Sequence, residues 1–424
     1  MPLMLKNGFV VRDKVVQTNI IIDNGKIADI TDELPQGAAD IEVLDCTGLH
    51  ILPGLIDMHV HLREPGYEYK EDLKSGSRAA VQGGVTSICS MANTNPPVDN
   101  SSIVSWIKRR SDEIGLCDIL PYAALTKGMK GEELTEIGDI LSAGACGFSD
   151  DGRPVASSEV MRRGLEYTRF FGSFIACHEE DAPLFNGGSM HEGRVSAECG
   201  IKGAPAEAES IMVARDIELV RLTGGRIHLC HISSRRSVEH IWRAKEAGLN
   251  VTAEVTPNHL TLTEEMCRSY NSFSKVNPPL RSEADRLALL DALKSGVIDC
   301  IASDHAPHHL DDKLKEFDYA AFGMIGLQLI VPLISRLVED GVISWSEFAN
   351  ITAANPAKIL NLSDRGVIAR GKVADIAVID SKCEYIFDES INVSKSQNTP
   401  YWKEKLKGKA VYTIKNGKIV NTGS

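Results

Sequence analysis

Two histidines at alternate positions, His59 and His61, lie in the apolar stretch "GLIDMHVHLREPG" of residues 54–66. Side chains two apart in a β-strand point to the same face, so both imidazoles could grip one cation. Asp57 shares that parity and could orient a histidine ring. Arg63 follows two residues later, and its planar fork could bind a carboxylate if the chain stays extended. The stretch therefore predicts a metal site with an anion-binding residue beside it.

Further polar residues follow other apolar runs along the chain. They are Asn93 in "MANTNPP", Asp150 and Asp151 in "GFSDDGRP", His178, His231, Asn277 in "VNPPLR", and Asp304 with His308 in "SDHAPHH". Burying so many polar groups at one place is costly unless something pairs them, and a pair of divalent metal ions would do so. The strand-end geometry does not separate Asp150 from Asp151 as a ligand. His50, His191, His228 and His240 are interpreted as structural, and His228, out of phase with His231, is expected to face the helices.

Eight short apolar runs supply the strands that would position these residues. They span 54–61, 85–91, 118–125, 145–150, 173–178, 226–231, 250–256 and 297–304. Amphipathic segments, such as 101–115, separate several of them, which indicates a parallel sheet covered by helices. Eight such units predict a (β/α)8 barrel of the TIM type, whose sites lie at the C-terminal ends of the strands. A doubly wound sheet is the alternative, although no Gly-x-Gly-x-x-Gly turn follows any strand.

The two chain ends resemble each other more than either resembles the middle. Both carry β-branched alternation broken by an Asn-Gly turn, at Asn24-Gly25 and Asn416-Gly417, which is typical of a hairpin. We predict that residues 1–52 and 366–424 join into one small β domain, a β-sandwich. Residues 53–365 would form the barrel, giving an α/β protein of two domains.

Composition excludes several classes of partner. The formal charge of −12 argues against nucleic acid and against an anionic membrane. We find no signal-peptide pattern and no apolar run of the roughly 18 residues that a membrane span needs. The ten cysteines are scattered without a Cys-x-x-Cys pair, so we expect free thiols in a reducing, cytoplasmic compartment.

The motifs taken together resemble those of a known family. "GLIDMHVHLREPG", "MANTNPP", "GFSDDGRP", the single histidines 178 and 231, and "SDHAPHH", in this order, are similar to the amidohydrolase superfamily. Within it, the chain resembles the bacterial dihydroorotases of the longer type over essentially its whole length. The resemblance implies a zinc-dependent cyclic amidohydrolase of pyrimidine biosynthesis. Its reaction would be the reversible cyclisation of N-carbamoyl-L-aspartate to L-dihydroorotate with loss of water.

The resemblance also implies a role for each site residue. His59, His61 and Asp304 would bind the more buried zinc, His178 and His231 the exposed one, and Asp151 would bridge both. One zinc would satisfy the same ligands, but two are favoured. Many relatives use a carboxylated lysine as the bridge, and none is present in "AGACGFSDDGRP". Substrate contacts would come from His61, Arg63, Asn93, Asn277 and His308, and from the backbone of Phe322 and Gly323.

The implied mechanism uses a metal-bound hydroxide as nucleophile, with Asp304 as the general acid and base. The charged stretch 310–322 is interpreted as a mobile lid over the mouth, or as an exposed helix–loop connection. A homodimer and a complex with aspartate transcarbamoylase are the partners that the resemblance suggests. Two alternatives stay open: a hydantoinase or allantoinase, and a metal-free barrel that serves as an assembly scaffold.

Overall fold

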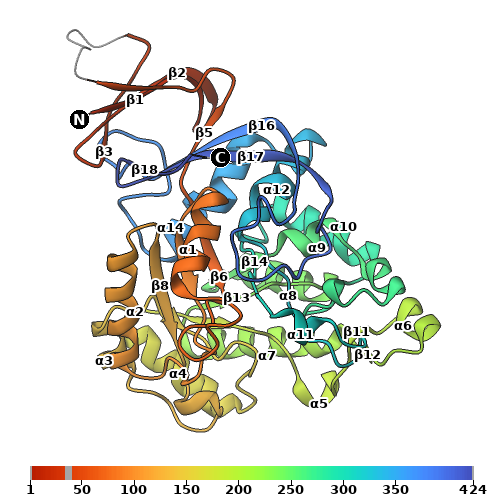
Figure 1. Ribbon diagram of the computed structural model, residues 1–424. Coiled ribbons are helices and arrows are strands. Elements are labelled where there is room, and N and C mark those ends of the chain that lie inside the picture. The colour runs from red at the N-terminus through yellow and green to blue at the C-terminus, as the bar shows by residue number, and fades with distance from the viewer. Residues whose placement is uncertain (1, 34–40, 423–424) are drawn as a thin grey trace.

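The computed structural model describes residues 2–33 and 41–422. Residues 1, 34–40 and 423–424, which belong to the predicted small domain, lie outside the described residues. A helix-covered barrel forms the body of the molecule, and a sheet made from both chain ends lies above it (Figure 1). No helix within 2–33 and 41–422 has the length and apolar character needed to cross a membrane.

Eight parallel strands form the barrel, in chain order around the sheet. They are β6 (Leu55–Val60), β7 (Val85–Ser90), β8 (Asp118–Ala123), β9 (Gly147–Phe148), β10 (Ile175–Cys177), β13 (Ile227–Leu229), β14 (Val251–Val255) and β15 (Cys300–Ile301). The sheet nearly closes where His61 donates its backbone N–H to the carbonyl of His305 at 2.8 Å. Each strand lies within one of the eight apolar runs, so the predicted barrel is confirmed.

Helices cover the outside of this sheet or lie in the loops that follow its strands. They are α1 (Leu73–Gln82), α2 (Ser101–Ile114), α3 (Ile137–Ser142), α4 (Ser158–Phe170), α5 (Ala182–Phe185), α6 (Arg194–Cys199), α7 (Glu207–Thr223), α8 (Arg235–Glu246), α9 (Pro257–Thr261), α10 (Glu283–Lys294), α11 (Leu310–Lys313), α12 (Ile330–Glu339), α13 (Trp345–Ala349) and α14 (Asn355–Ile359). A small ribbon of β11 (Met190–His191) and β12 (Gly203–Ala204) lies beside α6. Helix starts follow sequence signals: Asp72 and Ser75 form a capping box at α1, and Ser234 caps α8.

Strand faces divide the core in two layers. Outward side chains such as Leu229, Ala253 and Ile301 pack against the helices in the largest apolar cluster. Inward side chains such as Cys230 and Cys300 lie in a smaller cluster with Tyr122. Both layers are buried, which explains why the strands are almost continuously apolar.

The chain ends build a second, separate sheet. Its strands are β1 (Leu3–Val11), β2 (Val15–Asp23), β3 (Lys26–Thr31), β4 (Glu42–Asp45), β5 (His50–Pro53), β16 (Ile376–Ile386), β17 (Lys405–Lys415) and β18 (Lys418–Asn421). The predicted sandwich takes the form of one continuous sheet, because β5 pairs with both β1 and β16. Its two halves enclose a shared apolar core that includes Leu5, Ile20, Ile51 and Ile376.

Two tight turns bring the ends of this sheet together. Asn24 and Gly25 join β2 to β3, and Asn416 and Gly417 join β17 to β18, all four with positive φ. Both hairpins are therefore as predicted. The residues just before β16 also belong to this core, since Ile368 and Ala374 are buried in it. These contacts support the division into 1–52 plus 366–424 and 53–365, which stays a prediction.

Candidate active site

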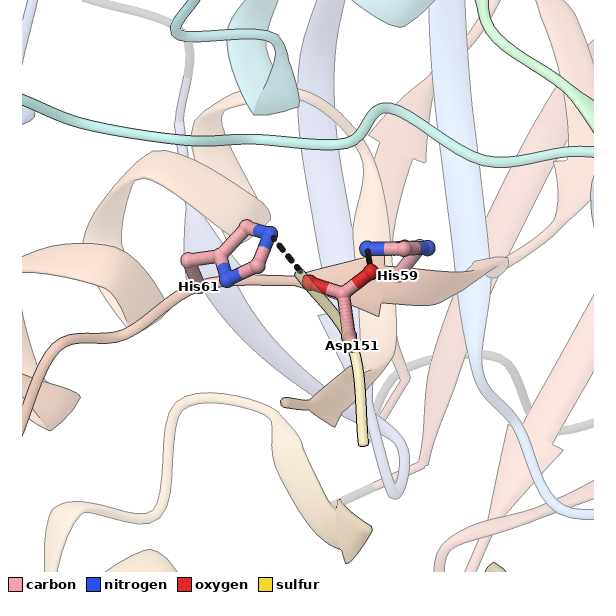
Figure 2. Close-up of side chains that lie close together, drawn as sticks. All are labelled: His59, His61 and Asp151. Atoms are coloured by element: carbon pink, nitrogen blue, oxygen red, sulfur yellow. Dashed lines mark ion pairs between the residues drawn. The ribbon is translucent and has the colours of Figure 1, made fainter. Parts of the chain in front are cut away.

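Four histidines surround one carboxylate at the C-terminal ends of the barrel strands. Asp151 Oδ1 lies 3.6 Å from His59 Nε2, 3.5 Å from His178 Nδ1 and 3.5 Å from His231 Nε2. Asp151 Oδ2 lies 3.6 Å from His61 Nε2. Figure 2 shows Asp151 directing one oxygen to each of the two histidines of β6 and its end. Residues from three strand ends thus meet around a single buried acid, which follows a fourth strand.

Asp304 completes the set from the end of β15. Its Oδ1 lies 3.1 Å from His61 Nε2 and 3.6 Å from His59 Nε2. On the other side of Asp151, His178 Nδ1 and His231 Nε2 are 3.0 Å apart. The structure therefore brings all six predicted ligands together in two overlapping groups, one around His59 and His61 and one around His178 and His231.

The donor atoms fit metal ions better than they fit one another. His59 Nε2 and Asp151 Oδ1 are buried and have no hydrogen-bond partner among the described residues. Two ligands at the usual zinc distances in a tetrahedral site lie about 3.3 Å apart, which is close to the separations around Asp151. Within the described residues, His59, His61 and Asp151 form one potential metal-binding group, and Asp151, His178 and His231 another.

Neighbouring Asp150 points elsewhere. It accepts hydrogen bonds from the backbone N–H of Leu125 and from the backbone and hydroxyl of Thr126. Burial raises the pKa of Asp150 to about 6 despite these bonds. At Asp151, burial acts in the same direction, but His59, His178 and His231 outweigh it and hold the pKa well below its usual range. The two adjacent acids therefore have different partners, which the sequence alone could not show.

Backbone turns at the strand ends set the directions of the His231 and Asp304 side chains. His231 has φ of 35° and Asp304 has φ of 46°, in the left-handed region that non-glycine residues seldom adopt. Such backbone strain costs on the order of 1–3 kcal/mol and is concentrated at functional sites. The period of a regular strand consequently does not apply at these positions.

Glu254 is a buried residue of this site that the sequence analysis missed. Its carboxylate accepts from His59 Nδ1 at 2.9 Å, from His228 Nε2 at 3.0 Å and from the backbone N–H of His231 at 3.3 Å. These bonds leave His59 Nε2 free to bind a cation. The available signal was an acid within the otherwise apolar run 250–256, where an unpaired charge would be costly.

The orientation predicted for His228 from strand parity is wrong, and the role suggested for Asp57 is not the one the structure shows. His228 faces the barrel interior, bonded to Glu254 and Thr252, because the turn at His231 takes that residue out of the strand. Asp57 does not orient a histidine ring, since its Oδ1 accepts from the backbone N–H groups of His59 and Ser303. Glu254 occupies the ring-orienting position instead.

Arg63 reaches the mouth by a turn rather than by an extended course. It has φ of 63°, donates from Nε to the carbonyl of Pro307 at 3.2 Å, and places Nη2 3.3 Å from His308 Nε2. This contact joins two predicted substrate-binding residues, Arg63 after the first barrel strand and His308 after the last. Both side chains are largely buried.

The two predicted asparagines are already bonded to other site residues. Asn93 accepts from His61 Nδ1 at 3.0 Å and donates to Asp151 Oδ2 at 3.1 Å, so it connects two candidate ligands. Asn277 donates to Glu180 Oε2 at 2.8 Å, and that oxygen lies 3.6 Å from His178 Nε2. Their contacts with substrate stay predictions.

Lys313 makes hydrogen bonds inside the loop after β15, and a lid role for residues 310–322 stays a prediction. Lys313 is fully buried and donates to the carbonyls of Ala321, Gly323 and Lys275 at 2.7, 3.1 and 3.2 Å. Gly323 donates to the Lys275 carbonyl, so a substrate contact through its N–H requires that bond to be shared. Its φ of 133° and a clash of any Cβ with Ala306 at 2.8 Å require glycine there. Phe322 lies with its ring 4.4 Å from Lys275 Nζ.

Family comparisons agree with this geometry. The "Dihydro-orotase-like" family model matches residues 48–237, and the "Amidohydrolase family" model matches residues 225–421. A barrel of this kind with these matches is that of a cyclic amidohydrolase, and the protein is an enzyme of that class.

Relatives that match the chain over its full length show which cyclic amidohydrolases it resembles. The chain is 44% identical to a dihydroorotase of Pelobacter propionicus over 423 residues, with 99% of each chain covered. It is also 44% identical to a dihydroorotase of Aquifex aeolicus over 421 residues, again with 99% of each covered. This protein belongs to the dihydroorotase family.

Solved structures share the fold. An L-hydantoinase from Arthrobacter aurescens has a TM-score of 0.89 at 24% identity, covering 100% of this chain and 96% of its own. A dihydropyrimidinase from Brevibacillus agri has a TM-score of 0.86 at 24% identity, with the same coverage. At this identity the likeness establishes the barrel with its end sheet and nothing finer.

Proposed function

We propose that this enzyme is a zinc-dependent dihydroorotase that interconverts N-carbamoyl-L-aspartate and L-dihydroorotate. The observation that carries the proposal is the meeting of four histidines and two aspartates at one buried place, in a chain 44% identical to dihydroorotases. Two of their atoms there, His59 Nε2 and Asp151 Oδ1, have no hydrogen-bond partner among the described residues. A hydantoinase function has only fold-level support. A scaffold function would not require the full ligand set.

Two zinc ions fit the residues better than one, because the donors form two groups that share Asp151. His59, His61 and Asp304 would hold the first ion, and His178 with His231 the second. When bound, zinc supplies a water of lowered pKa and a polarised substrate carbonyl.

The protein's own groups supply orientation and proton transfer. Asp304 is the general acid and base: it takes a proton from the attacking water and delivers it to the departing ring nitrogen. Asn93 orients His61 and Asp151 through its two hydrogen bonds. Arg63 and His308 would bind the substrate carboxylate, which gives an acidic protein a locally positive site. Asn277 and the backbone of Phe322 and Gly323 would contact the ring.

The cellular setting belongs to the same proposal. All ten cysteines are free thiols and seven of them are buried, which suits a reducing, cytoplasmic compartment. A homodimer and a complex with aspartate transcarbamoylase stay predictions from the resemblance.

Asp304→Asn tests the assignment most directly. We expect loss of dihydroorotate hydrolysis by about 10²–10⁴-fold, because the amide cannot carry the proton. Because Asp304 is also assigned as a ligand, metal content is measured on the same samples with zinc in excess, and activity should stay low even in samples whose metal content equals the wild-type value. A wild-type protein that neither binds zinc nor gains activity when zinc is added would reject the proposal in favour of a scaffold.

A further inference from the structure

His308 lies between two side chains that can only donate hydrogen bonds. Arg63 Nη2 lies 3.3 Å from its Nε2, and Lys70 Nζ lies 3.3 Å from its Nδ1. The ring is mostly buried, with 13% of the side chain exposed, and its backbone N–H is bonded to Asn398. Burial together with Arg63 and Lys70 holds the pKa of His308 far below its usual range, so the ring is neutral.

A neutral imidazole carries one N–H and one lone pair, so it can accept from only one of these two cations. The other ring nitrogen must direct its N–H at a donor. Among residues 2–33 and 41–422 nothing satisfies this N–H, and an anion at that nitrogen would do so. The question is which nitrogen carries the hydrogen.

The surroundings of Lys70 favour a hydrogen on Nε2. At the Nδ1 side the nearest carboxylate oxygen, Asp312 Oδ2, is 3.8 Å from the ring, beyond hydrogen-bond distance. Lys70 Nζ is closer to Nδ1 than that oxygen is, at 3.3 Å, and pairs with the oxygen at 3.0 Å. A hydrogen on Nδ1 would therefore face an ammonium group without an acceptor, whereas a lone pair there accepts from Lys70.

On the Nε2 side, a hydrogen on the ring would lie next to a second donor, Arg63, so that the two could bind the same acceptor. There the hydrogen lies beside the Arg63 guanidinium, and both groups can donate to one oxygen of an anion. This assignment rests on the proposed function, in which Arg63 and His308 receive the substrate carboxylate.

We propose that Lys70 is a positioning residue that holds His308 as its Nε2–H tautomer, so that His308 and Arg63 donate together to the substrate carboxylate. Lys70 is itself fixed in place: its carbonyl accepts from Ser396, and the rings of Tyr67 and Tyr69 lie 5.7 and 5.5 Å from its ammonium.

The test is long-range proton–nitrogen NMR on the metal-loaded enzyme labelled with ¹⁵N-histidine, with His308 assigned through His308→Gln. The wild-type spectrum should show a protonated Nε2 and an unprotonated Nδ1. In Lys70→Met this preference should be lost, and KM for N-carbamoyl-L-aspartate should rise about tenfold or more while kcat changes by less than about threefold, because one oriented charge-assisted bond is worth on the order of a factor of ten. Lys70→Arg should restore both.

Lys395→Met is the matched control. Lys395 pairs with Asp72 and donates to the carbonyl of Glu68 at 2.7 Å, so it holds the same loop without touching His308. Its spectrum and KM should equal the wild-type values. A protonated Nδ1 in the wild type, or an unchanged KM in Lys70→Met, would overturn the proposal. A wild type that turns over neither compound would overturn the proposed function instead, and the spectrum would still decide the tautomer.

Discussion

Replacing Glu254 by glutamine should weaken metal binding at a residue that touches no metal ion in our assignment. The carboxylate accepts from His59 and His228 at 2.9 and 3.0 Å and is fully buried. Partners of this kind are worth about 10–100-fold in metal affinity, or about 1.4–2.7 kcal/mol. Burial opposes ionisation of Glu254, yet the bonds from His228 and His59 bring its pKa far below the usual range.

From the structure we expect Glu254→Gln to lose metal affinity at the lower end of that 10–100-fold range. The glutamine amide oxygen can still accept from His59, and its amide nitrogen can donate to His228 if that ring reverses its tautomer. The reversal is available because the Thr252 hydroxyl lies 2.9 Å from His228 Nδ1 and 3.3 Å from the carbonyl of Ile227, so it can donate or accept. We therefore expect about a tenfold loss for Glu254→Gln, and a larger loss when Thr252→Val blocks the reversal.

Competition with a chromophoric zinc chelator measures the affinity, and excess zinc should restore activity. Thr252→Val alone should have a small effect. Glu71→Gln is the matched control, since Glu71 is a buried carboxylate bonded to His305, which is not a proposed ligand. Wild-type zinc affinity in Glu254→Gln would refute the reasoning, as would an equal loss in Glu71→Gln.

Three further results are expected. Arg63→Ala should reduce activity on dihydroorotate far more than on an uncharged cyclic amide, because only the former has a carboxylate for it to bind; equal losses would reject that role. Activity should be indifferent to removal of bicarbonate, since Asp151 rather than a carboxylated lysine lies between the two ligand groups; strong stimulation by added bicarbonate would count against this. Burial, with a smaller effect of Lys275, lowers the pKa of Lys313 to about 7. The unfolded chain then binds more protons than the folded one between about pH 7 and 10.5, so this group adds stability as pH rises, by up to about 1.4 kcal/mol per unit. The free energy of unfolding in urea should rise less between pH 7 and pH 9 in Lys313→Met than in the wild type. An identical rise in both proteins would contradict the lowered pKa of Lys313.

The barrel was predictable because its signal is repeated. Each of the eight strands is an apolar run, and the period of two places His59 and His61 on one side of β6. The Asn-Gly pairs at 24–25 and 416–417 similarly predicted both hairpins, since their positive φ values match what that turn requires.

Orientation beyond the strand ends was not predictable from periodicity. Arg63, His231 and Asp304 all adopt positive φ, so the two-residue period of a β-strand does not give the direction of their side chains. Glu254 shows a second limit: its partners His59 and His228 come from other strands, and only the closed barrel brings them to it. Pairing across the barrel depends on strand tilt and stagger, which one sequence does not state.

The position of β5 between β1 and β16 has a consequence for how the chain must be made. Pro53 pairs with Ile376, so a ribosome releases the first half of that sheet tens of seconds before its partner emerges, at ordinary translation rates. During that interval one side of β5 has unpaired backbone groups and is open to association with other chains. Cells overproducing the first 375 residues should accumulate aggregates or chaperone-bound chains, whereas co-expressing residues 366–424 should rescue soluble protein.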